Sequence, residues 1–496
     1  MSEHSQAETC RFSPGRAVGG LLALVLLSGC AVGPTYRRQP GDLPATWAGT
    51  AATPAPTAAA DAEKALADWW TVFQDQELSS LVDRAIAANL DLKLAAARVR
   101  QARASRGSAF AGLGPTANTT GARKRSQPSG SSSASAGDRL PTTNQYQAGF
   151  DAAWELDLVG GVRRGVEAAG ADLQAAVEAR HDALVTLVAE VARSYIDLRT
   201  FQQRAEIARQ NLISQQHSAS LTRQRHEGGF VSGLDVANAE AQVATTAAQI
   251  PLLEASAQQT IHSLSLLLGR EPGALMPELW PAGAVPVAPP AVPMGLPSDL
   301  LRRRPDIRQA EAQIHAATAR IGVATADLYP HFTLSGALGY QAANSGNLFD
   351  PLSRFWSLGP SLTWRVFDSG RIRSNIELQK ALEEQTVIAY RQTVLSALQE
   401  VENALLAAAR EQEHRQALLQ AADAFRRATK LADALYANGQ TDFLNVLVAQ
   451  RSLQAAEDAL AQSTAALSTD LVALYKALGG GWDAPEAPDG GASAGR

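Results

Sequence analysis

The sequence of this 496-residue chain predicts an α+β fold that is internally duplicated, with each copy pairing two β-strands with a long helical hairpin. Three observations support this prediction: a repeat at one spacing, period-2 alternation in short segments, and long stretches without helix breakers. The corresponding positions of the repeat are Trp154 and Trp364, Gly229 and Gly439, and Leu268-Gly269 and Leu478-Gly479. Each pair is 210 residues apart (364 − 154, 439 − 229 and 478 − 268). A common spacing over so long a segment indicates a duplication.

Four segments have the pattern of β-strands. Residues 146–157 alternate between an apolar and a polar face, and residues 332–341 and 356–366 repeat this pattern. A weaker strand is expected at 116–122, followed by a loop at 123–143. The apolar face of the first clear strand consists of Tyr146, Ala148, Phe150, Ala152, Trp154 and Leu156. One such segment alone is more typical of a soluble β-sandwich, but three with aromatic ends in an exported chain favour a transmembrane barrel.

Long helices continue from the strands. Residues 371–438 contain neither proline nor glycine, and an unbroken helix over these residues would extend about 100 Å. Residues 162–227 lack proline and predict the matching helix of the first copy, and a further helix is expected over 77–111. Gly229 and Gly439 are expected to end the long helices.

Shorter helices return from the two tips. They are expected at 234–268 and 444–478, with Ser232 and Asp442 as candidate N-caps. Pro251 should kink the first of them. The sequence therefore predicts two helical hairpins.

The N-terminus indicates export and lipid modification. The apolar run at 17–27 follows basic residues and is too short to span a bilayer, as in a secretory signal. The junction Leu27-Ser28-Gly29-Cys30 resembles a bacterial lipobox, which implies cleavage before Cys30 and acylation of that residue. Ala31 then favours the outer membrane. The alternative is an ordinary signal peptide with an incidental cysteine. Since Cys10 lies in the removed segment, no disulfide is expected.

Four membrane-type strands cannot close a barrel, and an open sheet edge cannot face lipid. The chain is therefore expected to oligomerise. Two copies would give eight strands with a filled or very narrow interior, whereas three copies would give twelve. The small polar residues on the inward face suit a water-filled lumen, which the hairpins would continue as a helical tube. The sequence predicts a conduit that runs from the outer membrane into the periplasm.

Several motifs between residues 30 and 478 point to one family. They are Cys30-Ala-Val-Gly-Pro-Thr-Tyr36, Trp69-Trp70 to Leu78, Trp154 to Gly161, Leu301 to Arg308, Tyr329-Pro330 and Val448-Ala-Gln-Arg451. With them the chain resembles the outer membrane factors of the TolC family, specifically the NodT- and OprM-type efflux lipoproteins. The resemblance implies a homotrimer with a shared barrel, four strands from each chain, and a periplasmic α-helical barrel. It also implies a periplasmic adaptor and an inner-membrane pump as partners, with an RND-type pump favoured.

The repeat and the motifs together divide the chain into six segments. They are a signal peptide (1–29), a lipidated extended tether (30–68), a first repeat (69–268), a linker (269–298), a second repeat (299–478) and a disordered tail (479–496). The function implied is a passive outer-membrane exit duct for drugs or other small molecules. The alternatives are the same duct serving type I protein secretion or metal efflux, or a lipidated periplasmic adaptor.

The hairpin tips hold the gate residues that the resemblance implies. In this family a tyrosine and an acidic residue bridge adjacent hairpins, and Tyr436 and Asp235 occupy these positions. The alternative is that Tyr436 only packs and Asp235 only begins a helix. The turns expected to contact the adaptor contain Gly229, Ser232, Gly439 and Thr441.

Members of this family also carry a ring of acidic residues at the narrowest point of the periplasmic mouth, and this sequence departs from that pattern. Asn445 and Val448 stand where relatives carry aspartate. We therefore expect closure to rely more on the Tyr436–Asp235 contact and on apolar packing around Leu444 and Val448, unless Asp442 supplies the charge from the neighbouring turn.

The sequence contains no motif for catalysis. Its eight histidines have no metal-type spacing, and neither a phosphate loop nor a Gly-x-Ser-x-Gly elbow is present. Arg302-Arg303-Arg304 is followed by Pro305 and is explained as the start of a helix. The net charge of −5 gives no electrostatic reason to expect nucleic acid as a partner. We expect a protein that is not an enzyme and that binds no cofactor or metal.

Overall fold

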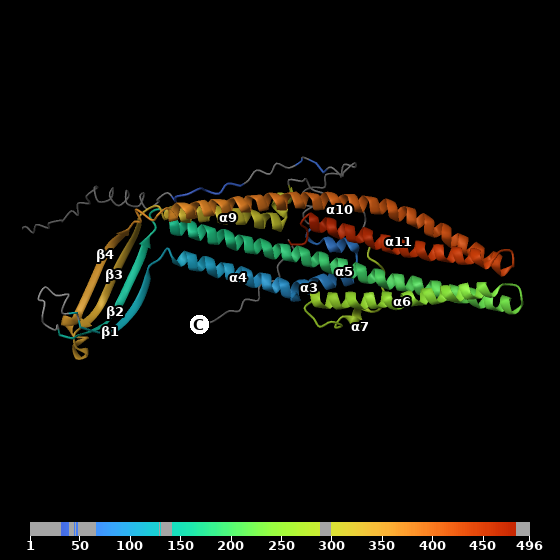
Figure 1. Cartoon of the computed structure of the whole chain (residues 1–496), viewed down its shortest axis with the longest axis horizontal. Helices are drawn as coiled ribbons and strands as arrows, with labels where there is room; N and C mark the ends of the chain where they lie inside the picture. Colours follow the sequence, from blue (N-terminus) through green and yellow to red (C-terminus); the bar gives the residue numbers. More distant parts are fainter. Residues whose placement is uncertain are drawn as a thin grey trace, which may run out of the picture. The chain divides into compact units, whose positions relative to one another are not determined.

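The computed structural model describes residues 31–38, 44, 46–47, 66–127, 129, 141–287 and 299–482. Its main elements in chain order are η1 (Trp69–Phe73), α3 (Gln76–Ala88), α4 (Leu90–Ala111), β1 (Thr116–Ser126), β2 (Thr143–Leu156), α5 (Gly161–Glu227), α6 (Gly233–Leu267), α7 (Met276–Leu279), α8 (Leu300–Arg303), α9 (Pro305–Ala326), β3 (His331–Ala342), β4 (Arg354–Thr363), α10 (Arg371–Ala437) and α11 (Phe443–Ala477) (Figure 1). Long helices and a small antiparallel sheet confirm the predicted α+β class. The predicted lipidation site, Cys30, lies outside the described residues.

The duplication is confirmed at the helix boundaries. Helices α5 and α10 each have 67 residues, α6 and α11 each have 35, and the bounds of both pairs differ by 210 (371 − 161 and 443 − 233). Helices α4 and α9 each have 22 residues but differ by 215 (305 − 90). The β1–β2 connection is five residues longer than the β3–β4 connection (16 against 11), which accounts for the change in spacing.

The chain forms two compact units. The first contains the sheet and the helix ends next to it, within Met1–Arg38, Arg100–Gln174 and Glu311–Ala389; the second contains the hairpins, within Gln39–Val99, Ala175–Ala310 and Tyr390–Arg496. No helix in the described part of the chain is both long and apolar enough to cross a membrane.

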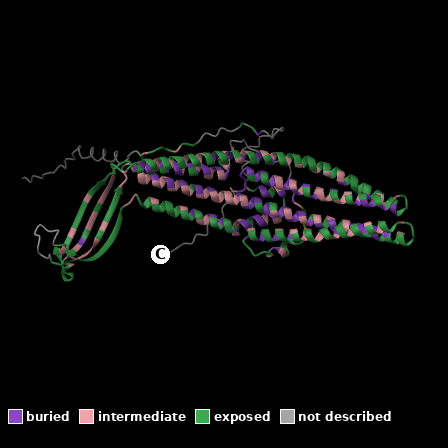
Figure 2. Ribbon diagram, in the orientation of Figure 1, coloured by how far each residue is buried: buried purple, intermediate pink, exposed green. Residues whose placement is uncertain are grey.

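The sheet has the order β1-β2-β3-β4, and all of its pairings are antiparallel. The register places Phe150 opposite Leu338, and Leu338 opposite Trp356. These three apolar side chains share one face and are exposed, Leu338 at 60% and Trp356 at 80%. Figure 2 shows buried residues along the helices, whereas the strands are mostly exposed or intermediate. The predicted alternation is therefore present, with an apolar face that the described residues leave uncovered.

Matching tryptophans anchor the helix end of the sheet. The indole N–H of Trp154 donates to the carbonyl of Leu113 at 2.9 Å, and that of Trp364 donates to Leu328 at 3.0 Å. Since buried or interfacial indoles need an acceptor, each bond fixes a ring beside the start of its hairpin of strands. Trp364 lies just after β4, which ends at Thr363, so the strand predicted to reach residue 366 is shorter than expected.

Strand β1 is longer than the sequence predicted. Residues 123–126, expected to begin a loop, continue the strand because they pair with β2, with Arg123 opposite Tyr146 and Ser126 opposite Thr143. The guanidinium of Arg123 also lies 5.5 Å from the centroid of the Tyr146 ring.

The helix predicted over 77–111 is broken at Asn89. This residue has an extended ψ of 135° and separates α3 from α4. Its amide donates to the carbonyl of Leu267 at 2.9 Å and accepts from the backbone of Leu92 at 2.9 Å. The second bond caps α4, and the first joins the break to the end of α6.

Residues next to both ends of the described chain are held by packing. In the first unit Tyr36 stacks on His315 with ring centroids 4.7 Å apart. In the second unit the backbone N–H of Gly481 donates to Leu66, and Trp482 stacks on His181 at 4.9 Å. Residues 479–482 are therefore ordered, which corrects the prediction that the disordered tail begins at residue 479.

Candidate functional site at the hairpin tips

Both hairpins turn with the same backbone geometry. Gly229 has φ 75° and donates to His226, and the next N–H, of Phe230, donates to Arg225. Gly439 has φ 73° and follows the same pattern. A left-handed glycine with this pair of bonds is a Schellman C-cap, which satisfies the last carbonyls of each long helix. The predicted helix stops at the two glycines are confirmed.

The two hairpins are packed together just behind the tips. A buried apolar cluster draws on all four hairpin helices: Ala219, Ala239, Tyr436, Phe443, Val446 and Leu447. The rings of Tyr436 and Phe443 lie 5.6 Å apart. Since these contacts join helices from both copies of the repeat, a change at the cluster affects both tips.

Tyr436 is the polar member of this cluster. Its side chain is 2% exposed, and its hydroxyl donates to the hydroxyl of Thr222 at 3.1 Å. The guanidinium of Arg225 lies 4.7 Å from its ring centroid and also donates to its backbone carbonyl. Tyr436 is thus fixed to α5 of the first hairpin by a hydrogen bond and a cation–π contact.

Asp235 has a different partner. Its carboxylate accepts from the backbone and hydroxyl of Ser232 at 3.1 and 2.9 Å, and its own N–H donates to the Ser232 side chain. This capping box confirms Ser232 as the predicted N-cap of α6. The expected Tyr436–Asp235 contact is therefore not formed within this chain: the Tyr436 hydroxyl bonds to Thr222 of the other hairpin, and the Asp235 carboxylate bonds to Ser232 at the start of its own helix.

The start of α11 presents an open face. Leu444, Asn445 and Val448 are exposed, whereas Val446 and Leu447 are buried. The amide of Asn445 donates to the Thr441 hydroxyl at 2.8 Å. Leu444 and Val448 therefore present apolar surface that the described residues leave exposed at the tip.

Asp442 holds the N-cap position of α11, but its side chain makes no capping hydrogen bond, in contrast to the prediction. The Asn445 amide donates to the hydroxyl of Thr441 instead, and the Asp442 carboxylate is exposed to solvent. Asn445 corresponds to Asp235 in the first copy (445 − 235 = 210), so an acidic group is kept in only one of the two copies.

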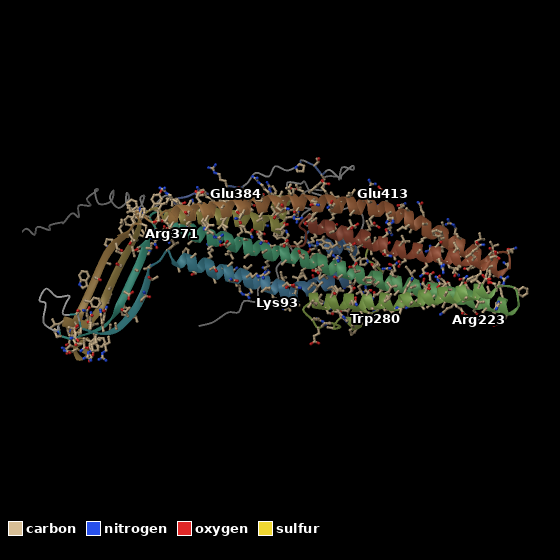
Figure 3. All side chains as sticks on the ribbon, in the orientation of Figure 1. Lys93, Arg223, Trp280, Arg371, Glu384 and Glu413 are labelled. Atoms are coloured by element: carbon tan, nitrogen blue, oxygen red, sulfur yellow. The ribbon has the colours of Figure 1, made fainter. Side chains whose placement is uncertain are left out.

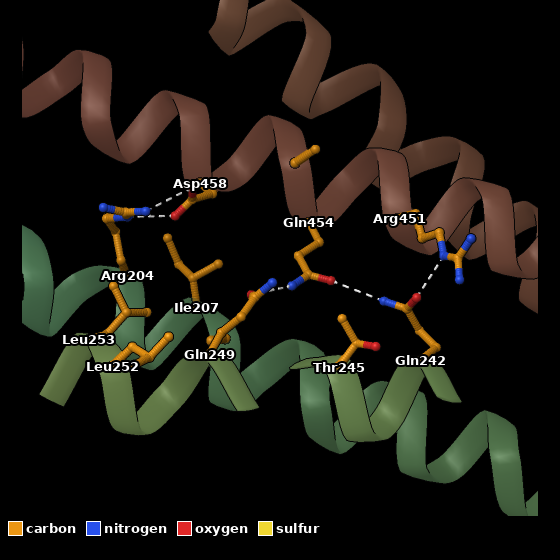
Figure 4. A pocket seen from close by; sticks show the side chains of 12 residues that line it. Arg204, Ile207, Gln242, Thr245, Gln249, Leu252, Leu253, Arg451, Gln454 and Asp458 are labelled. Atoms are coloured by element: carbon orange, nitrogen blue, oxygen red, sulfur yellow. Dashed lines mark hydrogen bonds and ion pairs between the residues drawn. The ribbon is translucent and has the colours of Figure 1, made fainter. Parts of the chain in front are cut away.

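A ladder of polar side chains continues behind the tips. The amide of Gln454 lies between Gln242 and Gln249, and Arg451 donates to Gln242 at 2.6 Å (Figure 4). The ladder lines a hollow of about 620 Å³ between α5, α6 and α11, with the Arg204–Asp458 ion pair at its other end. Closer to solvent, Arg223 (labelled in Figure 3) pairs with Glu240 across α5 and α6 at 2.6 Å. Polar groups therefore hold the hairpins in register. The described residues include no cluster of metal-ligating side chains.

Sequence reasoning missed three residues of the tips. Thr222 and Arg225 both contact Tyr436, which lies more than two hundred residues further along the chain. Phe230 is 77% exposed at the first turn. The segment Gly228-Gly229-Phe230 could have indicated an aromatic residue presented by a turn, but nothing local indicates the other two.

Asp433 should make the tip region depend on pH. The pKa of its carboxyl lies above the ordinary 3.8, because burial raises it more than the Gln450 hydrogen bond and the charge of His217 lower it. Since the folded pKa exceeds the unfolded one, the group destabilises the fold at neutral pH, and this cost disappears as pH falls through the folded pKa. Asp433→Asn should raise the midpoint of thermal unfolding at pH 7 and change it little near pH 3.5. An equal change at both pH values would contradict this assignment.

Comparison with known proteins shows which family this chain resembles. A model of the family described as outer membrane efflux protein matches the chain twice, over residues 81–270 and 296–480. Nodulation protein T of Rhizobium leguminosarum bv. viciae is 35% identical, with 93% of each chain covered. Outer membrane protein OprJ of Pseudomonas aeruginosa is 36% identical, over 95% of this chain and 97% of OprJ. The solved structure of the outer-membrane channel OprN is 38% identical and aligns with a TM-score of 0.85, over 91% of this chain and all of OprN.

Proposed function

The chain belongs to the outer membrane efflux protein family, and from this membership we propose that three copies form the passive exit duct of a tripartite efflux system. The duct passes drugs or other small molecules from an inner-membrane pump, through a periplasmic adaptor, to the outside. The family is a family of channels and not of enzymes. Transport energy therefore has to come from the pump.

The main support for this proposal is the four-stranded sheet. Its outer strands, β1 and β4, each have one edge without a partner in the described chain, and its apolar face is uncovered. Unpaired backbone groups cannot face lipid, so the edges must be paired by other copies. Pairing β4 of one copy with β1 of the next closes a ring of twelve strands for three copies. The polar face, with residues such as Asp151 and Ser357, then lines the lumen.

The tips support the proposed adaptor contact. The turns that contain Gly229, Ser232, Gly439 and Thr441 lie at the free ends of the hairpins, and the exposed Phe230 ring adds an apolar anchor beside them. Aromatic side chains of this kind are favoured at protein interfaces. Lipidation at Cys30 supplies a second membrane anchor in this proposal; an unmodified mature N-terminus, measured by intact mass, would rule it out.

Cysteine cross-linking tests the closed ring. The mature chain should contain no free thiol, so Thr120→Cys on β1 can be combined with cysteine at successive polar-face positions of β4, from Phe355 to Thr363. One of these pairs should yield covalently linked trimers on a denaturing gel. Thr120→Cys with Ser335→Cys, on the interior strand β3, is the matched control and should not link. A purified protein that is monomeric, or that links only into dimers, would refute the proposal.

A further inference from the structure

Three arginines share the apolar face of the sheet at its loop end. The register puts Arg123 opposite Tyr146. It puts Arg354 opposite Tyr340, which in turn pairs with Ala148, two residues from Tyr146. Arg125 is two residues beyond Arg123 and so lies on the same face. All three side chains are exposed. Lys124, between Arg123 and Arg125 in sequence, lies on the opposite, polar face by the same alternation.

The apolar face below Arg123 is nearly as tall as the lipid-facing band of an outer-membrane barrel. From Tyr146 to Trp154, β2 has eight steps, about 27 Å along the strand and about 20 Å along the axis of a barrel with the usual tilt. Lipid-facing bands of outer-membrane barrels are about 25 Å tall. With Trp154 at the lower boundary, Arg123 and Arg125 lie near the upper headgroups. Arg354 is attached at the level of Ala148, two residues closer to Trp154, and its long side chain can reach the same headgroups.

This upper level faces the outside of the cell. All four connections from helix to strand or from strand to helix lie at the Trp154 end, and only the β1–β2 and β3–β4 loops lie at the arginine end. Since the family extends its helices into the periplasm, the loop end is in the outer leaflet.

The arginines have no acidic partner in the described chain. Among the described residues none of them forms an ion pair. Asp350, an exposed residue in the β3–β4 loop four positions before Arg354, does not pair with them either. Arg123 stacks on Tyr146, and Tyr340 contacts Phe349 edge-on with ring centroids 5.5 Å apart. Unneutralised guanidinium groups above an apolar band, among interfacial aromatic rings, are complementary to anionic headgroups.

We propose that Arg123, Arg125 and Arg354 bind the phosphate groups of the phosphorylated glycolipid that forms the outer leaflet. Guanidinium groups bind phosphate oxygens bidentately, and the exposed apolar face beneath them accommodates the acyl chains. In the proposed trimer this gives a collar of nine arginines. The inference rests on the proposed barrel, because only a lipid-facing sheet places this face against the membrane.

Binding of bisphosphorylated lipid A to the purified trimer tests the proposal. Native mass spectrometry should show lipid A retained by the wild type, with affinity reduced about fivefold for each arginine removed. The variants are Arg354→Gln alone and Arg123→Gln with Arg125→Gln and Arg354→Gln. Lys124→Gln is the matched control, since it removes a neighbouring charge from the polar face, and it should leave the affinity within about twofold.

Two further arms identify the ligand. Lipid A without phosphates should bind the wild type as weakly as bisphosphorylated lipid A binds the triple variant. Inorganic phosphate in millimolar excess should not displace the lipid, because it offers nothing to the apolar face. Equal losses for Lys124→Gln and the arginine variants, full retention by the triple variant, or displacement by inorganic phosphate would each overturn the proposal. Failure of the wild type to form trimers on size-exclusion chromatography would instead refute the proposed function.

Discussion

Arginine at Leu338 should destabilise the assembled channel by about 2–4 kcal/mol, because it places a charge in the middle of the lipid-facing band. Leu338 lies between Phe150 and Trp356 in the register, and its side chain is exposed on the apolar face. Reversible unfolding in urea with lipid vesicles gives the free energy of unfolding directly. The expected result is a lower urea midpoint with little change of slope.

Ser335→Arg is the control on the same strand. Ser335 lies three residues from Leu338, on the polar face, opposite Ala153 and Gly359. Arginine there should leave the free energy of unfolding within about 1 kcal/mol of wild type, because the lumen is wet, and should alter single-channel conductance. Equal destabilisation by Leu338→Arg and Ser335→Arg would show that the two faces are not lipid and water, and the shared barrel would be wrong.

Val448→Asp should make the channel sensitive to block by divalent cations from the periplasmic side. Val448 is 56% exposed on the open face of α11, next to the uncharged Asn445. In the proposed trimer the substitution places three carboxylates around one opening, and rings of carboxylates bind cations. Planar-bilayer recordings should show the blocking concentration falling by about tenfold or more relative to wild type.

Val448→Asn separates charge from size. Asparagine has nearly the shape of aspartate but no charge, so cation block should remain weak in this variant. Potent block of the wild type would show that an existing carboxylate already lines the mouth. Asp442 is then the first residue to replace, because its carboxylate is exposed and has no capping bond, whereas Asp235 is held by Ser232.

Features that depend on local sequence could be predicted. The bounds of the hairpin helices agree within a residue, since proline-free runs in the two long helices and left-handed glycines such as Gly229 act through their own neighbours. The strand faces were also predictable, because side chains alternate along any strand. Membership in a family of outer-membrane channels followed from the motifs.

Only the tertiary structure decided which distant groups meet. The helix break at Asn89 depends on the Leu267 carbonyl, and β1 reaches Ser126 because β2 pairs with it. The hydroxyl of Tyr436 bonds to Thr222, 214 positions away, in place of the expected Asp235. A side chain's hydrogen-bonding capacity can be read from its type, but its partner depends on how packed helices bring remote groups within about 3 Å. Periodicity along one helix does not contain that information.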